Sequence, residues 1–188
     1  MKKLLLVLAL ISSIIVVAAC GANSDNVGEA SNNVDSEKQS NEDKKKPKSW
    51  EFVWNAPEGF SSDDGETYVT DDYPNDTSNI TYTSSEDDGK GINFTSKEFE
   101  TVLEDTYSKL GMEIDVVVDR FEKIEKNGCV GLVIESNYSL NNVKLIQLQY
   151  AYQVGEKIHT VCYTAVGDTW LEVFKENAKS ITITPIYD

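Results

Sequence analysis

Three turn signals divide residues 114–166 into four segments, and this pattern constrains the fold more than any other feature of the chain. Asn127-Gly128 is a strong signal for a two-residue β-hairpin turn. Further turns are expected at Asn141-Asn142 and at Gly155-Glu156. Strands that are joined by such short turns must be antiparallel neighbours. The segment therefore predicts a four-stranded antiparallel meander.

Two other segments have the spacing of amphipathic helices. Thr95 is followed three residues later by Glu98, which is the signature of a capping box, and one apolar face then continues to Leu110. Asp168 is expected to cap a second helix that runs to Ala178. The first helix has one substantial apolar stripe, so it is expected to lie against a sheet.

Short strand signals precede and follow these elements. They cover residues 50–54, 79–84, 92–95 and 181–184. The expected order is three strands, a helix, the meander, a helix and a last strand. This order predicts an α+β fold in which two main helices pack on an antiparallel sheet.

The N-terminus has the pattern of a secretory signal. Lys2 and Lys3 precede an apolar run over residues 4–17, and small residues then lead to Cys20. The sequence at this point resembles a bacterial lipobox, with residues 1–19 as signal peptide and Cys20 as the lipidated residue. Two acyl chains give stable anchoring, so the prediction is a lipid-anchored protein on the extracytoplasmic face of the cell membrane. The alternative is an ordinary secretory cleavage site that happens to precede a cysteine.

Composition separates a tether at residues 20–48 from a single domain at residues 49–188. Residues 21–48 contain no aromatic residue, and such a segment cannot bury enough apolar surface to become ordered. Three lysines at 44–46 offer a weak alternative as a lipid-headgroup patch. The domain has 26 acidic and 10 basic residues, a net charge of −16. This charge argues against nucleic acid as a partner and against adhesion of the domain to an anionic bilayer.

The two ends of the domain carry a family resemblance. Residues 54–60 (Trp-Asn-Ala-Pro-Glu-Gly-Phe) resemble the opening of PsbP/Mog1-like domains. Tyr163-Thr164-Ala165, a helix with Trp170 and Phe174, and residues 178–183 resemble their close. The resemblance covers roughly residues 50–184 and implies an α/β/α sandwich. It also implies a non-catalytic binding or accessory module, and it transfers no functional residue.

Catalytic signatures are not found in the sequence. The domain has one histidine, His159, which is expected to pack among aromatic residues. Cys162 is three residues along the same expected strand and points to the other face, which argues against a Cys–His pair. The strand register places Cys129 and Cys162 about 20 Å apart, too far for a disulfide. No cofactor motif is found, so no cofactor is expected.

Acidic turns are the first candidate for a binding site. Residues 51–89 contain 11 acidic residues and neither lysine nor arginine. Carboxylate-rich loops can bind Ca²⁺, and the candidate ligands are Asp63, Asp64, Asp87 and Asp88. No EF-hand spacing is present, and turn formation on a solvated acidic face explains these residues more simply.

The two central strands of the meander supply the second candidate. Gln147, Gln149, Thr160, Cys162 and Thr164 are expected to share one face. This face is interpreted as a solvated face or as a layer under the second helix. If it is open, Gln147, Gln149, Thr160 and Thr164 could line a shallow ligand cleft.

The leading hypothesis is therefore a membrane-anchored, non-catalytic module that binds another envelope component, with a protein as the expected partner. A small-ligand or Ca²⁺-binding lipoprotein is the alternative. A carboxylate-based envelope hydrolase is a third and weaker class, because the single histidine leaves few catalytic arrangements open.

Overall fold

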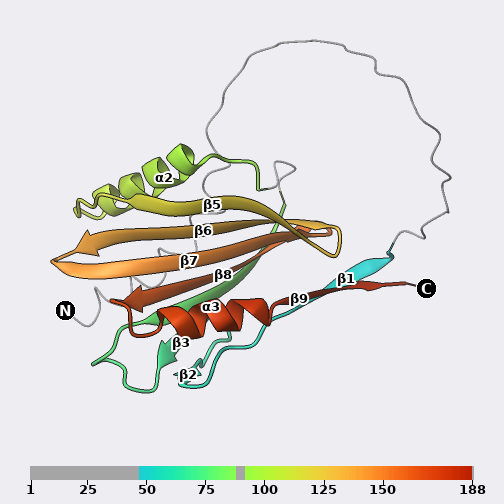
Figure 1. Ribbon diagram of the computed structural model, residues 1–188, viewed down its shortest axis with the longest axis horizontal. Helices are drawn as coiled ribbons and strands as arrows, with labels where there is room; N and C mark the ends of the chain where they lie inside the picture. Colours follow the sequence, from blue (N-terminus) through green and yellow to red (C-terminus); the bar gives the residue numbers. More distant parts are fainter. Residues whose placement is uncertain (1–46, 88–91, 188) are drawn as a thin grey trace, which may run out of the picture.

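The computed structural model describes residues 47–87 and 92–187 (Figure 1). The signal peptide, Cys20, nearly all of the tether and Asp88 lie outside these residues. The described helices are α2 (Ser96–Lys109) and α3 (Leu171–Lys179). The strands are β1 (Ser49–Val53), β2 (Phe60–Ser61), β3 (Thr67–Thr70), β4 (Asn79–Glu86), β5 (Val117–Lys126), β6 (Cys129–Leu140), β7 (Val143–Val154), β8 (Lys157–Val166) and β9 (Thr182–Ile186).

Seven strands form one antiparallel sheet in the order β2-β3-β4-β8-β7-β6-β5. Strands β5 to β8 are neighbours in chain order, which confirms the predicted meander. The register is also as expected, because Gln149 pairs with Cys162 and Tyr152 pairs with His159. The α+β fold class is therefore confirmed.

The first and last strands form a separate two-stranded ribbon. Strand β1 pairs antiparallel with β9, from Ser49 opposite Ile186 to Val53 opposite Thr182. The Lys48 amide donates to the Ile186 carbonyl at 2.8 Å, which extends the pairing by one residue. Both strands were expected from the sequence, but they leave the main sheet and project beside the C-terminus (Figure 1).

Each helix covers a different face of the sheet. Phe99, Leu103 and Tyr107 of α2 pack in one core with residues of β6 such as Leu132 and Ile134. A second core on the opposite face joins side chains of α3 to β7 and β8: Phe174, Ala178, Leu148, Val161 and Tyr163. Because strand side chains alternate between faces, one sheet serves both cores, and the molecule is an α/β/α sandwich.

The start of α2 differs from the expected strand at residues 92–95. Thr95 is the N-cap of α2, and its capping box with Glu98 is formed as predicted. An N-cap commits the chain to the helix, so residues 92–94 form an irregular approach whose Ile92 is buried in the core. Leu110 is exposed rather than on the apolar face, and Tyr107 takes the buried position.

Two further differences concern short elements. Strands β2 and β3 were not expected; they have two and four residues and flank the turn that contains Asp64. The N-cap of α3 is Trp170, without a side-chain hydrogen bond, so the prediction that Asp168 caps this helix is wrong. The Asp168 carbonyl instead accepts from the Leu171 amide at 3.3 Å in the turn before the helix.

Candidate functional site

The predicted ligand residues of the meander do lie on one face. Gln147 of β7 pairs with Thr164 of β8, and Gln149 and Thr160 point to the same side of the sheet. Their exposed fractions are at most 5%, so the interpretation as a solvated face is wrong, while a role of these residues in ligand binding stays a prediction. The expected alternative, a layer under α3, is also wrong, because α3 packs on the other face.

These residues belong to a larger group that we call the polar layer. It extends onto β4 and β6 through Asn79, Thr81 and Ser136, and its other members are Gln147, Gln149, Thr160 and Thr164. The Gln147 amide donates to Thr164 Oγ1 at 3.3 Å, and the Gln149 amide donates to Gln147 Oε1 at 3.5 Å. Three buried oxygens of the layer have no hydrogen-bond partner in the described part of the chain: Asn79 Oδ1, Ser136 Oγ and Gln149 Oε1.

Both domain cysteines are free and buried, as predicted from the strand register. Burial raises the pKa of the Cys162 thiol to about 12, although hydrogen bonds with Thr164 and Thr81 act in the opposite direction. A thiol with such a pKa is protonated at neutral pH and is a poor nucleophile.

His159 lies among aromatic side chains on the α3 side of the sheet. Its ring stacks on Phe52 with centroids 4.5 Å apart, and its Nδ1 lies 2.9 Å from the Tyr82 hydroxyl. Burial lowers the pKa of His159, and Lys157 lowers it further. The imidazole and the Cys162 thiol point to opposite faces of β8, so they form no catalytic pair.

The calcium candidates are separated in the structure. Asp64 Oδ1 accepts hydrogen bonds from the Glu66 and Thr67 amides, both at 2.8 Å, and closes the turn before β3, while Asp63 is exposed in the same turn. Asp87 follows β4 and accepts from the Gln153 amide at 2.5 Å. Within residues 47–87 and 92–187, no group of three or more His, Cys, Asp or Glu side chains could hold a metal ion. The calcium site stays a prediction.

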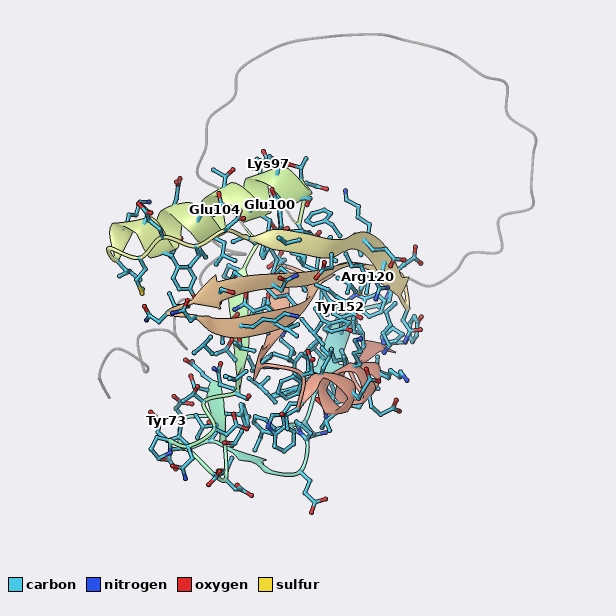
Figure 2. All side chains as sticks on the ribbon, turned by 60° about the vertical axis from the view of Figure 1, so that its left-hand side comes forward. Tyr73, Lys97, Glu100, Glu104, Arg120 and Tyr152 are labelled. Atoms are coloured by element: carbon cyan, nitrogen blue, oxygen red, sulfur yellow. The ribbon has the colours of Figure 1, made fainter. Side chains whose placement is uncertain are left out.

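A groove that sequence reasoning missed lies between α3 and strands β5, β6 and β7. Its volume is ≈ 520 Å³. We call it the α3 groove, and Arg120 and Tyr152 mark its position in Figure 2. The lining residues are Arg120, Ile124 and Lys126 of β5, Val133 and Glu135 of β6, Tyr150 and Tyr152 of β7, and Lys175, Ala178 and Lys179 of α3.

Local sequence explains the shape of the α3 groove. Lys175 and Lys179 are four residues apart and therefore lie on the same face of α3. Gly131 lies under the groove, where a Cβ atom would come within 2.7 Å of the Tyr152 ring and 2.8 Å of Ile124. The absence of a side chain at Gly131 thus allows these two groups to pack directly on the strand backbone.

The groove has four cationic side chains and one carboxylate, Glu135. Arg120 contacts Glu122 at 2.5 Å and Glu135 at 3.3 Å; the hydrogen bond with Glu122 is the main cause of its raised pKa. The pKa of Tyr150 is raised first by burial and then by Glu135, while Arg120 and Lys179 lower it. The Tyr150 hydroxyl therefore lies within the field of cations from both walls of the groove.

Some signal for the groove was present in the sequence. Arg120, Ile124 and Lys126 are separated by even numbers, and an i, i+4 lysine pair follows Trp170. Neither pattern shows that α3 and strands β5, β6 and β7 line one groove, because that placement depends on long-range packing.

Comparison with known proteins defines the fold class. No protein-family model matches the sequence, and no curated protein matches it significantly. The structure is similar to the solution structure of cyanobacterial PsbP (CyanoP) from Synechocystis sp. PCC 6803, with a TM-score of 0.52 and 13% identity, over 72% of this chain and 93% of that one. It is also similar to LpqN from Mycobacterium tuberculosis, described as involved in cell envelope biogenesis, with a TM-score of 0.44 and 14% identity, over 73% and 85% of the two chains. At such low identity, the likeness to CyanoP shows a PsbP-like fold.

Helices that could span a membrane are absent from the part of the chain that the structure describes.

Proposed function

We propose that this protein is a lipid-anchored, non-catalytic binding module that docks another component of the cell envelope through the α3 groove. The anchor is Cys20, which follows the signal-like segment and precedes the tether. The observation that carries the proposal is the groove itself. It is an open recess with tyrosines in its lining and with side chains from a helix and three strands.

The composition of the groove suits recognition of a protein surface. Tyrosine and arginine are enriched among residues that contribute most to protein–protein binding, because they combine apolar area with hydrogen-bonding groups. Tyr150 and Arg120 both line the groove, and Ala178 leaves space between the two lysines of α3. Rigid strands and one helix hold these side chains, so little ordering is required when a partner binds.

The test is site-specific photo-crosslinking in intact cells that express the full chain. Benzoylphenylalanine replaces Lys179 in the lining of the groove or, as the matched control, Lys97 on α2. These side chains are 72% and 78% exposed, and each forms an i, i+3 ion pair. We expect one reproducible envelope protein to be captured from position 179 and not from position 97. Equal capture from both positions, or no capture from either in cells that contain the folded protein, would contradict the proposal.

The polar layer supports a second candidate function, the binding of a small neutral ligand. Three buried oxygens without a described partner form a costly arrangement, because a buried polar atom without a hydrogen bond destabilises the fold by about 1–3 kcal/mol. A ligand with hydroxyl or amide donors would satisfy these acceptors. The layer contains no charged side chain, so a charged ligand would remain uncompensated there.

Gln149→Met tests the second candidate, because methionine keeps the approximate volume and removes the unpartnered oxygen. Glucose and N-acetylglucosamine are the neutral probes, with glucuronate as the charged control. If the layer binds ligand, a neutral probe raises the Tm of the parent protein but not that of the variant, and glucuronate has no effect. Failure of both neutral probes to raise the Tm of the parent protein counts against a sugar-binding layer.

A further inference from the structure

The charge of the α3 groove is opposite to that of the domain around it. The domain has 26 acidic and 10 basic residues, and four of those ten basic residues line this one groove. Glu135 is the only acidic residue in the lining. Charges farther away than the Debye length of about 8 Å are strongly screened at physiological ionic strength. A group inside the groove therefore responds mainly to the four cations and to the glutamates that contact them.

Three of these cations have an exposed glutamate partner that is easily exchanged, although Arg120 also contacts the less exposed Glu135. Arg120 contacts Glu122, Lys175 contacts Glu172, and Lys179 contacts Glu176. The side chains of these three glutamates are 52% to 87% exposed. Exposed ion pairs contribute only about 0–1 kcal/mol each, so an incoming carboxylate can replace them at little cost.

The same three glutamates define an acidic rim. Glu122, Glu172 and Glu176 each contact a lining cation, but none of them lines the groove itself. A long polyanion would meet this rim on leaving the groove and would be repelled. A short segment with carboxylates at its centre and basic residues on its flanks would be attracted at every position. Such matching of charge gives specificity for one partner over others.

We infer that the α3 groove binds a short segment of a partner protein that carries central carboxylates with basic residues on either side. The carboxylates replace the rim glutamates on Arg120, Lys175 and Lys179. Apolar side chains next to the carboxylates pack against Ile124, Val133 and Tyr150. This inference rests on the proposed docking function and adds the chemistry of the docked segment.

The test uses the full chain in neutral detergent and a fluorescein-labelled hexapeptide, Lys-Leu-Glu-Glu-Leu-Lys. A second peptide replaces both glutamates by glutamine. The groove variant is Lys175→Glu/Lys179→Glu, and the control variant is Lys97→Glu/Lys109→Glu on α2. The control variant changes the net charge by the same amount as the groove variant. Each variant replaces one lysine that forms an i, i+3 ion pair and one lysine in the last turn of its helix.

Fluorescence anisotropy decides between the outcomes. We expect the groove variant to bind the glutamate peptide at least about tenfold more weakly, and the control variant to stay within about twofold of the parent. We expect the parent protein to bind the glutamine peptide about as weakly as the groove variant binds the glutamate peptide. Equal binding of the two peptides, or equal effects of the two variants, overturns the inference. The inference is also overturned, in favour of a polymeric anion, if the parent protein binds inorganic polyphosphate more tightly than the glutamate peptide and the groove variant loses this binding.

The outcome is separable from that of the docking proposal. If the glutamate peptide shows no groove-dependent binding while crosslinking from position 179 still captures one envelope protein, the inference is wrong and the proposed function stands. If crosslinking from position 179 also fails, the proposed function is contradicted too.

Discussion

At the scale of single residues, Gly131 shows how one missing side chain shapes the α3 groove. Tyr152 and Ile124 occupy the space that a Cβ atom would take, and both belong to a well-packed part of the sheet. Overpacking of such a site forces side chains off their preferred rotamers and shifts the backbone.

Gly131→Ala is therefore expected to destabilise the protein by about 1–3 kcal/mol, measured by urea unfolding. Val130→Ala is the control, because Val130 is an exposed neighbour on the same strand, and it should change stability by less than about 0.5 kcal/mol. If Gly131→Ala is as stable as the control variant, the contact between Tyr152 and the strand backbone is looser than the structure indicates.

His159 predicts a pH dependence of stability at the same scale. Burial lowers its pKa in the folded state below the usual value of 6.5, so the unfolded chain binds more protons between the two pKa values. The contribution of His159 to the free energy of unfolding is fully present above about pH 6.5. It is lost as the pH falls toward the pKa of the folded state.

His159→Gln removes this titration and keeps a hydrogen-bond acceptor for Tyr82. Urea unfolding between pH 7.5 and pH 5 should show the parent protein losing stability relative to the variant, at about 1.4 kcal/mol for each unit of pKa difference. Parallel curves over that range would show that His159 has the same pKa in both states.

At the scale of elements, the capping box is the clearest link from sequence to structure. Thr95 Oγ1 accepts from the Glu98 amide, and the Glu98 carboxylate accepts from the Thr95 amide at 2.7 Å. These bonds satisfy backbone donors that the first turn of α2 leaves unpaired. They also position Phe99, which is buried in the core between α2 and the sheet.

Thr95→Ala should lower the free energy of unfolding by about 1 kcal/mol, because alanine cannot accept the capping hydrogen bond. Thr101→Ala on the exposed face of α2 is the matched control, and it should be neutral or slightly stabilising because alanine favours helix. Thermal unfolding measures both variants. Equal Tm values for the two variants would mean that the cap contributes nothing to the folded protein.

The elements also show which structural information is local. Turns of two residues fix the strand register by themselves, so the pairing of Gln149 with Cys162 could be predicted without a structure. Strands β2 and β3 could not be predicted, because their two and four residues carry no detectable period. Strand β3 is held by pairing with β4, and β2 is held by pairing with β3. Residues 92–95 were misread because the apolar Ile92 and Phe94 pack in the helix-side core without forming a strand.

The candidate sites divide in the same way. Alternation along β7 and β8 placed the polar layer on one face, but alternation says nothing about what a face packs against. The buried alternative therefore placed the layer under the wrong helix, because α3 packs on the opposite face. The α3 groove has lining residues from β5 and from α3, although about 50 residues separate these elements in the sequence. Such meetings depend on the packing of the whole domain.

At the scale of the whole molecule, the β1–β9 ribbon relates the predicted tether to the groove. The described chain enters at the outer end of the ribbon, beside the C-terminus (Figure 1). At its inner end, the Asn127 side-chain amide donates to the Ile183 carbonyl at 2.6 Å, and Lys126 of the groove donates to the Ile181 carbonyl. The ribbon thus connects the point where the described chain begins to the end of the sheet that carries Lys126.

The anchor itself gives the prediction for the whole molecule. If Cys20 carries a diacylglyceryl group, the full chain should take up radiolabelled palmitate and sediment with membranes, because two acyl chains hold a protein stably at a bilayer. Cys20→Ser should abolish the label and release the protein into the soluble fraction, while Cys129→Ala should keep both label and sedimentation. A parent protein that is unlabelled and soluble would identify an ordinary secretory signal. Any partner found through the groove would then have to be sought away from the membrane surface.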